Sequence, residues 1–444
     1  MRILYLAHRI PYPPNKGDKI RSFNEIRYLS RSHEIDLACL VDDPDDMRYE
    51  NDLRKYCRNV FLEPLNAARA RLNGILHAAG GSCLSVGYFY SRSLQRIIDR
   101  CIADKSYDGI ICFSSPMAEY VLRSGLFHPG RRKNSANGSQ AAPRTPRLIM
   151  DFCDVDSDKW AQYAERSSFP KSLLYSFENR RLSRYEGTVA RLFDHSVFVS
   201  EREAELFKSN NPDTSTVSVI ANGVDSEYFD PASSHPLPKE SITDSKPDSG
   251  GTNGCRPTLV FTGAMDYFAN EEGITWFCTE ILPRIRSAVP DIRLFIVGRS
   301  PSKQVLALDD GNSVRVTGYV DDVRPYYEHA DVCVIPLRIA RGLQNKVLES
   351  MAMGKSVVAT PAAVQGIEVA SGEHILLAGE PESFADAVIC LLRDEISRRR
   401  IGAKARDYVV ANYGWKAKMT LFDRILLCDD VPIDERPPVI SSGL

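Results

Sequence analysis

Short runs of apolar residues recur along the chain, and segments with helical periodicity separate them. In the first half these runs cover residues 3–7, 35–41, 109–113, 148–152 and 196–199. In the second half they cover residues 258–262, 292–297, 314–317, 332–335, 356–359 and 375–377. The runs are continuously apolar instead of alternating, which is typical of parallel strands buried on both faces. With helical patterns such as 272–286 and 383–392 between them, they predict an α/β fold with doubly wound sheets.

The strand–helix alternation occurs twice, and a stretch rich in Pro, Ser, Gly and charged residues interrupts it at 231–257. We therefore predict two Rossmann-like domains, which the length of 444 residues also favours. The predicted parts are an N-terminal domain at 1–230 with a polar insert at 130–147, a flexible linker at 231–257, a C-terminal domain at 258–412, a helix at 413–430 and a tail at 431–444. We expect a cleft between the carboxyl edges of the two sheets.

The composition excludes some classes of protein. The chain has 56 basic and 58 acidic residues, whereas a nucleic-acid-binding protein usually has a basic excess. Its eleven cysteines are dispersed without a CxxC pair, which is typical of reduced thiols and predicts a cytoplasmic location. The first apolar run is too short for a signal peptide, and no apolar run reaches the length of about 18 residues that a membrane-spanning helix needs.

The segment 338–354, between two predicted strands, is the most informative part of the chain. Gly342 allows a close backbone approach just before a helix, and the free N–H groups of a helix start favour an anion. Lys346 and Glu349 are three residues apart and share a helix face, so they offer a cation for phosphate and a carboxylate for ribose hydroxyls. An ordinary surface helix with a Lys–Glu ion pair fits the same pattern equally well.

The loop after the first predicted strand, residues 8–21, offers a similar arrangement. Gly17 stands where a helix begins and would let a phosphate approach backbone N–H groups. Lys16, Lys19 and Arg21 add positive charge to this loop. The alternative interpretation is a plain β–α connection without a ligand.

Four acidic residues follow the predicted strand at 148–152: Asp151, Asp154, Asp156 and Asp158. Carboxylates at the end of a strand are suited to binding substrate hydroxyls, to acid–base chemistry or to metal ligation. We expect Asp151 or Asp154 to face the cleft and Asp158 to cap a helix. The histidines show no metal-ligand spacing, and His195 is predicted to be a core or capping residue.

Five short motifs then occur in one order: Asn-Gly-Val-Asp at 222–225, Phe-Thr-Gly at 261–263, Ile-Val-Gly at 296–298, Thr-Gly-Tyr-Val at 317–320 and the segment 342–354. In this order they resemble the group-4 retaining glycosyltransferases of the GT-B fold. The segments 8–21, 154–160 and 341–346 look like a narrower subgroup, the sugar transferases associated with the exosortase, or PEP-CTERM, exopolysaccharide system of Gram-negative bacteria.

The resemblance implies an acceptor-side N-terminal domain, a C-terminal domain that binds the donor nucleotide, and a last helix that crosses back to the first domain. It implies that Glu349 binds the ribose, that Lys346 and Gly17 bind the diphosphate, and that Tyr319 and Val320 hold the base. The full set of implied donor-binding residues is Gly17, Gly263, Arg299, Tyr319, Val320, Gly342, Asn345, Lys346 and Glu349.

The chain departs from the family pattern at three places. Arg341 replaces a glutamate, the usual Arg and Lys after Gly263 are missing, and no histidine stands near Asp154. The phosphate contacts must therefore come from other cations, for which Arg341, Lys346 and Arg299 are the candidates. The implied catalytic residues are Lys346, Arg341 and Asp154.

The function predicted from this resemblance is retaining transfer of a sugar from a nucleoside-diphosphate sugar to a glycan or polyprenyl-linked acceptor in exopolysaccharide synthesis. Positioning and fixed positive charge would carry the reaction without a metal or other cofactor. Two alternatives stay open. One is a nucleotide-sugar epimerase that uses Asp151, Asp154 and Asp156, and the other is a sugar-nucleotide-binding subunit that Arg341 has made inactive.

Contact with lipids of the inner membrane is a further expectation. Residues 65–79 place apolar residues on one helix face with Arg69 and Arg71 beside them, a pattern that can lie on an anionic lipid surface. The basic insert at 131–147 would either assist such binding or simply be solvated. The more common use of an amphipathic helix is packing on its own core.

Overall fold

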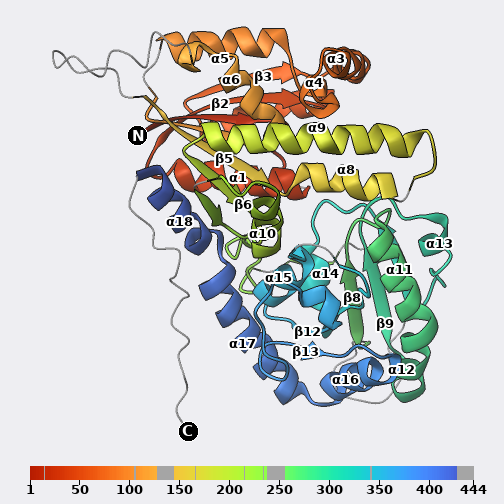
Figure 1. The fold of residues 1–444 in the computed structure, drawn as a ribbon. Helices are drawn as coiled ribbons and strands as arrows, with labels where there is room; N and C mark the ends of the chain where they lie inside the picture. Colours follow the sequence, from red (N-terminus) through yellow and green to blue (C-terminus); the bar gives the residue numbers. More distant parts are fainter. Residues whose placement is uncertain are drawn as a thin grey trace. The chain divides into compact units, whose positions relative to one another are not determined.

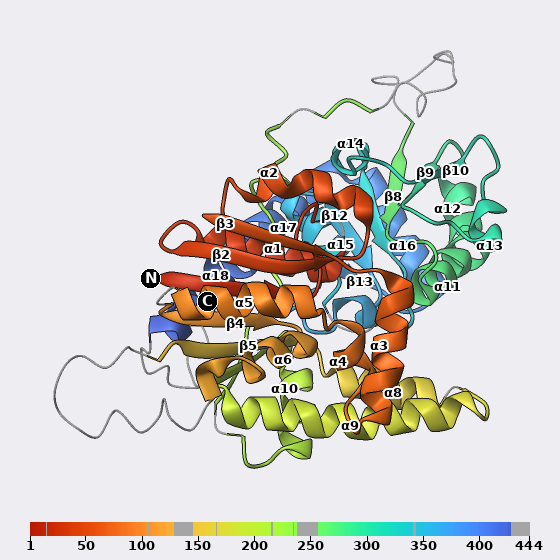
Figure 2. The same ribbon diagram turned by 90° about the horizontal axis from the view of Figure 1, so that it is seen from above.

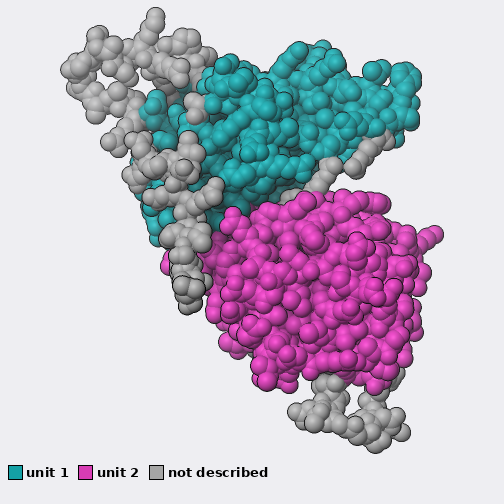
Figure 3. Space-filling view, turned by 60° about the horizontal axis from the view of Figure 1, so that its bottom comes forward, with its two compact units in different colours: residues 1–221, 418–444 teal, residues 222–417 magenta. Residues whose placement is uncertain are grey.

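The computed structural model of the protein describes residues 1–14, 16–104, 107–127, 145–165, 167–214, 216–233, 235–237, 256–340 and 343–427. The chain divides into two compact units, coloured separately in Figure 3. Unit 1 comprises Met1–Ala221 and Lys418–Leu444, and unit 2 comprises Asn222–Ala417. Each unit has its own parallel sheet, so the predicted α/β fold with two Rossmann-like sheets is confirmed.

Unit 1 contains a seven-stranded parallel sheet with the order β3-β2-β1-β4-β5-β6-β7. Its strands are β1 (Arg2–Ala7), β2 (Glu34–Val41), β3 (Asn59–Pro64), β4 (Gly109–Phe113), β5 (Arg147–Cys153), β6 (His195–Phe198) and β7 (Val217–Val219). The central strand β1 pairs with β2 on one side and with β4 on the other, and five of its six residues are buried. The reversal of strand order at β1 and β4 creates the place where such sheets usually bind ligands.

Helices cover both faces of this sheet, with α5 on one face and α1 on the other (Figure 1). The helices of unit 1 are α1 (Gly17–Leu29), α2 (Glu50–Leu53), α3 (Ala67–Ala79), α4 (Leu84–Tyr88), α5 (Arg92–Asp104), α6 (Ala118–Leu122), α8 (Asp156–Glu165), α9 (Lys171–Leu192) and α10 (Glu201–Asn210). The last helix, α18 (Trp415–Leu427), belongs to unit 1 from Lys418 onward. There its Asp423 lies 3.0 Å from His33 Nε2.

Unit 2 contains a six-stranded parallel sheet with the order β10-β9-β8-β11-β12-β13. Its strands are β8 (Thr258–Thr262), β9 (Arg293–Val297), β10 (Val314–Gly318), β11 (Val332–Ile335), β12 (Ser356–Ala359) and β13 (Leu376–Leu377). Its helices are α11 (Phe268–Trp276), α12 (Leu282–Ala288), α13 (Lys303–Leu306), α14 (Arg324–His329), α15 (Asn345–Ala352), α16 (Pro381–Arg393) and α17 (Glu395–Tyr413). Here β8 and β11 lie at the centre of the sheet, where the strand order reverses.

All eleven predicted strands are present, and the structure adds β3 and β7. Both added strands are at a sheet edge, since β3 pairs only with β2 and β7 only with β6. They are largely half-buried, so their sequences lack the continuous apolar run that marks a central strand. The helix predicted at 272–286 is also longer, because α11, a π-helical turn at Phe277–Ile281 and α12 follow one another from Phe268 to Ala288.

The domain limits differ from those predicted. Residues 222–230, placed in the first domain from the sequence, belong to unit 2. Of the predicted linker, residues 234 and 238–255 lie outside the described part of the chain, as do 130–144 of the polar insert and the residues from 428. The described end of the linker packs on unit 2, because the His235 amide donates to Glu328 and Leu237 packs against the core.

Helix α17 passes very close to the end of α15 at Gly402. A Cβ atom at this position would lie 2.2 Å from the carbonyl oxygen of Gly354. We expect Gly402→Ala to destabilise the protein by about 1–2 kcal/mol, because this overpacking outweighs the helix propensity gained. Denaturant unfolding measures the change. Gly379→Ala is the control, since its Cβ would meet its nearest neighbour at 3.8 Å, and an equal loss in both variants would contradict the expectation.

Candidate functional site

Lys346 lies in the first turn of α15 and is buried, with 8% of its surface exposed. Its ammonium donates to Asn270 Oδ1 and lies 4.7 Å from the centre of the Phe261 ring. These partners come from α11 and β8, so three segments of unit 2 converge on one cation. The alternative interpretation from the sequence, an exposed Lys–Glu ion pair, is wrong. Lys346 is buried, and its ammonium donates to an amide oxygen instead.

Burial changes the proton affinity of this amine. Desolvation lowers the pKa of Lys346 to about 7, and the nearby carboxylate of Glu349 only partly opposes the shift. A positive charge held in a dry site costs free energy, and an approaching anion would recover much of that cost. The position is therefore suited to a phosphate group.

Glu349 lies one turn further along α15 and is half-buried. Its Oε2 accepts a hydrogen bond of 3.0 Å from the Tyr327 hydroxyl, which also lies 2.7 Å from Thr262 Oγ1. Burial raises the pKa of Glu349, and the hydrogen bond from Tyr327 opposes this. Tyr327 thus fixes one carboxylate oxygen and leaves the other to accept a hydrogen bond from a ligand.

Two glycines bring the ends of β8 and β9 together beside Lys346. A Cβ at Gly298 would lie 1.6 Å from the Gly263 carbonyl oxygen, and a Cβ at Gly263 would lie 3.0 Å from Lys346 Nζ. Both glycines have positive φ angles. The Phe-Thr-Gly and Ile-Val-Gly motifs are therefore needed for close packing of two loops at the carboxyl edge of the sheet, next to the buried cation.

For the other donor-binding residues predicted in unit 2, the structure gives fewer contacts. Tyr319 and Val320 line a hollow of about 500 Å³ beside β10, and Tyr319 is 66% exposed. Arg299 is exposed, and its carbonyl accepts from Met265 N at 2.9 Å. Asn345 is half-buried, with Oδ1 lacking a hydrogen-bond partner among the described residues. Arg341 and Gly342 lie outside the described residues.

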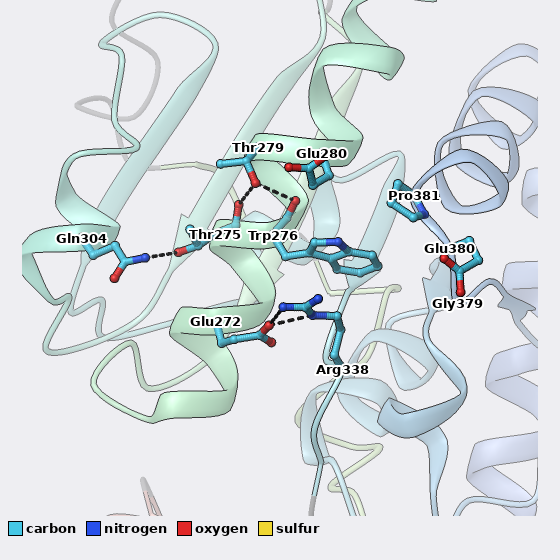
Figure 4. A pocket seen from close by; sticks show the side chains of 10 residues that line it. All are labelled: Glu272, Thr275, Trp276, Thr279, Glu280, Gln304, Arg338, Gly379, Glu380 and Pro381. Carbon is cyan, nitrogen blue, oxygen red and sulfur yellow. Dashed lines mark hydrogen bonds and ion pairs between the residues drawn. The ribbon is translucent and has the colours of Figure 1, made fainter.

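A larger hollow of about 700 Å³ lies elsewhere in unit 2 (Figure 4). Its lining includes Trp276, Glu280, Gln304 and an ion pair between Arg338 and Glu272. The Arg338 guanidinium also lies 5.3 Å from the centre of the Trp276 ring. None of the predicted site residues that the structure describes lines this hollow.

In unit 1, Gly17 begins α1 and has open space around it, since a Cβ atom added here would have no neighbour within 4 Å. The expected positive charge beside it is largely engaged elsewhere. Lys19 is 2% exposed and pairs with Asp46, and Arg21 is fully buried. The prediction that these two side chains add free positive charge to the loop is wrong, and Lys16 alone of the three is half-exposed.

Asp151 does not face solvent or a cleft. It is fully buried and accepts from Arg21 Nε at 2.8 Å, while Glu25 Oε1 lies 3.0 Å from the same nitrogen. Glu25 also accepts from the Tyr5 hydroxyl at 2.6 Å. The prediction for Asp151 is therefore corrected: its charge neutralises Arg21 inside the unit, because a buried guanidinium needs paired carboxylates.

The remaining acids after β5 lie near the start of α8. Asp154 is half-exposed and pairs with Lys159 at 3.1 Å, and Asp156 pairs with the same amine. Asp158 contacts Gln162 in its own helix, so it is not the expected cap. The backbone N–H groups are capped from other helices, that of Val155 by Glu203 and that of Ser157 by Glu186.

His8 was not predicted as a site residue, although it opens the segment 8–21. It stands after the central strand β1, stacked on Phe113 at 5.8 Å and 3.4 Å from Asp18 Oδ2. Burial would raise the pKa of Asp18, but hydrogen bonds and electrostatic attraction from His8 and Arg9 outweigh this effect and lower the pKa well below its usual range. His195 is a core residue as expected, buried and 2.9 Å from Ser218 Oγ.

The described part of the chain holds neither a metal-ligand cluster nor a membrane-spanning helix. No three His, Cys, Asp or Glu side chains among these residues converge as metal ligands. Within the same residues, no helix combines the length and apolar character needed to cross a membrane. None of the nine described cysteines forms a disulfide bond.

If Lys346 binds the donor diphosphate, as the resemblance implies, its lowered pKa predicts that donor binding depends on pH. Because the amine loses its proton as pH rises through about 7, the positive charge and the affinity for an anion both fall with rising pH. We expect affinity for a nucleoside-diphosphate sugar to weaken about tenfold between pH 6 and pH 8, measured by calorimetry. Lys346→Arg stays charged over this range and should give a flat profile. A flat profile in the unmodified protein would contradict the expectation.

Comparisons with known proteins point to glycosyltransferases. Residues 256–394 match the family model described as "Glycosyl transferases group 1". An uncharacterized 44.6 kDa protein in the cps region of Klebsiella pneumoniae is 22% identical over 424 residues, which cover 94% of this chain and 97% of that protein. Phosphatidyl-myo-inositol mannosyltransferase of Mycobacterium leprae is 28% identical over 41% of this chain, and the match spans about half of that enzyme.

Among solved structures, Anabaena Alr3699/HepE in complex with UDP superposes with a TM-score of 0.61 at 13% identity, covering 96% of this chain and 100% of that one. At this identity the likeness concerns the fold, which is that of GT-B glycosyltransferases. The group 1 match covers β8 to β12 and α15, the elements that hold Gly263, Lys346 and Glu349. The chain thus has the GT-B fold, its residues 256–394 match the group 1 glycosyl transferases, and the protein is a glycosyltransferase.

Proposed function

We propose that the protein is a retaining glycosyltransferase that moves a sugar from a nucleoside-diphosphate sugar to a glycan or polyprenyl-linked acceptor. The observation that carries the proposal is the pair on α15. Lys346 supplies a buried cation for the diphosphate, and Glu349, oriented by Tyr327, supplies an acceptor for ribose hydroxyls. The two side chains are one helical turn apart, which suits the length of a ribose linked to a diphosphate.

The proposed reaction uses the protein mainly for charge and position. As the bond between sugar and diphosphate breaks, negative charge grows on the leaving oxygen, and the Lys346 ammonium stabilises it in a site that excludes water. That oxygen can take the proton of the acceptor hydroxyl on the same face of the sugar, so the anomeric configuration is retained. Arg341, Arg299 and Asn345 are proposed as further donor contacts from unit 2, and no metal is required.

For unit 1 we propose two roles. Gly17 at the start of α1 offers free backbone N–H groups to the diphosphate, and its open surroundings support this. Asp154, half-exposed beside Lys159, is proposed to contact substrate hydroxyls. Asp151 is left out of the proposed site because it is fully buried.

The proposed biological setting is exopolysaccharide synthesis at the cytoplasmic face of the inner membrane. The relative in Klebsiella pneumoniae is named for its place in a cps region, and other relatives are named as GDP-mannose-dependent mannosyltransferases of phosphatidylinositol mannosides. These names support a lipid-linked or glycan acceptor. The motifs at 8–21, 154–160 and 341–346 further support the exosortase-associated subgroup.

Thermal shift against nucleoside diphosphates and their sugars tests the proposal first. A ligand at a hundred times its Kd stabilises the fold by about 2.7 kcal/mol, which raises the melting temperature by several degrees. The stabilising donor is then incubated with and without acceptor lipids. Conversion of the donor without acceptor would indicate an epimerase, and binding without transfer to any acceptor would indicate an inactive binding subunit.

A further inference from the structure

The exposed apolar side chains of unit 1 gather on two neighbouring structures, α3 and the hairpin formed by α8 and α9. Of the ten large apolar residues of unit 1 that the described structure leaves exposed, eight lie on α3 or at residues 163–177 of the hairpin. On α3 these are Leu72, Ile75 and Leu76, each at least 58% exposed. On the hairpin they are Tyr163, Phe169, Leu173, Leu174 and Phe177, with Phe169 the most exposed at 77%.

Hydrogen bonds fix these two structures to each other. Arg181 of α9 donates to the carbonyl of Ala78 at the end of α3 and to that of Ser82. The Arg181 guanidinium also lies 3.9 Å from the centre of the Phe177 ring, so it joins the end of α3 to the apolar stripe on α9. Figure 2 shows α3 beside the α8–α9 hairpin. We call the exposed residues of α3 and the hairpin the α3/α9 surface.

The exposed charges on α3 and α9 have one sign. Those of α9 are all basic: Lys171, Arg180, Arg184 and Arg191. Its two acids, Glu178 and Glu186, are buried and bond to backbone N–H groups of α4 and α8. Helix α3 has Arg69 and Arg71, both exposed, and no acid. Glu165 at the end of α8 is an exposed acid, but the exposed basic residues outnumber it. The described part of the α3/α9 surface is therefore mainly positive.

Apolar residues near the start of α9 are followed by basic residues, an order that suits the boundary between lipid and water. Phe169 lies in the turn just before α9. Within the helix, Leu173 and Phe177 are four residues apart, and Arg180 and Arg184 continue the same side. The hairpin also holds an aromatic cluster. The ring centres of Trp160 and Tyr163 lie 5.9 Å apart in an edge contact, and those of Trp160 and Tyr175 lie 5.4 Å apart. Apolar rings and leucines flanked by arginines and lysines are the composition of helices that lie in a lipid headgroup region.

We propose that the α3/α9 surface docks unit 1 on an anionic lipid bilayer, with Phe169, Leu173, Leu174 and Phe177 inserted among the lipids. Lys171, Arg180 and Arg184 meet the headgroups. Anionic lipid is favoured over a second copy of the chain, because a surface of mainly positive charge repels its own copy and attracts anionic headgroups. The docking concerns unit 1 alone and needs no donor, so it can be tested apart from the proposed transfer reaction.

The test is co-sedimentation of the full chain with vesicles of phosphatidylcholine, alone or mixed with the anionic phosphatidylglycerol. We expect binding to the mixed vesicles that weakens with added salt, and at least about tenfold weaker binding to neutral vesicles, because each basic residue near an anionic surface contributes roughly fivefold. The triple variant Phe169→Ser, Leu173→Ser, Phe177→Ser should lose at least about tenfold in affinity for the mixed vesicles. Its matched control is Leu306→Ser, Ile339→Ser, Ile396→Ser, three exposed apolar residues of unit 2, which should bind as the unmodified protein does.

A second variant keeps the test valid if the serine substitutions disturb folding. Lys171→Glu, Arg180→Glu, Arg184→Glu should abolish binding to anionic vesicles, whereas Arg284→Glu, Arg399→Glu, Arg400→Glu in unit 2 should not. Equal binding to neutral and anionic vesicles, or equal losses in variant and control, would overturn the proposal. So would a dimer in light scattering that the serine variant dissociates while vesicle binding is absent, since a second copy would then be the occupant.

Discussion

Replacing Lys346 with alanine is expected to reduce sugar transfer by about a hundredfold to a thousandfold, the range found when one preorganised donor to a developing oxyanion is removed. The reason is the position of the ammonium. It is buried among Phe261, Asn270 and Gly263, where a charge interacts more strongly than in water. The loss should appear in kcat as well as in KM, because charge on the diphosphate increases in the transition state.

Steady-state transfer with the stabilising donor measures this loss. Lys303→Ala is the matched control, because Lys303 is an exposed lysine of the same unit and should leave transfer unchanged. The thermal stability of Lys346→Ala should not fall, since the substitution removes a desolvated charge that has no carboxylate within ion-pair distance among the described residues. Transfer within about threefold of the unmodified protein would contradict the role given to Lys346.

Glu349→Ala is expected to weaken donor binding by about 1.5–3 kcal/mol, or roughly ten- to a hundredfold, as for hydrogen bonds to a charged group. Tyr327 loses one partner in this variant but keeps Thr262 at 2.7 Å, so folding stability should change little. Calorimetry with the nucleoside diphosphate measures the affinity. Tyr327→Phe leaves the carboxylate in place without its orienting hydroxyl and should lose less.

A nucleoside diphosphate without ribose hydroxyls distinguishes loss of the proposed contact from a general disturbance of the site. The 2′,3′-dideoxy nucleoside diphosphate should bind the unmodified protein as weakly as the complete ligand binds Glu349→Ala. The variant itself should not distinguish the two ligands. If Glu349→Ala still preferred the ribose form by about tenfold, the carboxylate would not be its binding group.

The sequence predicted the fold well because the central strands are continuously apolar, as β1, β4, β8 and β11 show. It missed β3 and β7, whose edge positions leave them half-buried with mixed composition. The sequence also placed the end of the first domain too late, at residue 230 instead of Ala221. Residues 222–233 look like loop in sequence, but contacts such as Arg406 with Asp230 hold them on unit 2.

In the candidate site, the sequence identified Lys346, Glu349 and Gly263 but not their partners. Asn270, Tyr327 and Thr262 come from three different elements, and nothing in their local sequence marks them as neighbours of α15. The error at Asp151 has a similar cause. A carboxylate at the end of a strand resembles a ligand group, and only the fold shows that Arg21 and Glu25 enclose it.

Transfer of a labelled sugar from the stabilising nucleoside-diphosphate sugar to acceptor lipids tests the central claim most directly, with the anomeric configuration of the product determined by NMR. We predict a product with the configuration of the donor, formed equally with and without a chelator and lost in Lys346→Ala. An inverted product, a product formed equally by Lys346→Ala, or a changed sugar nucleotide without any transfer would contradict this claim.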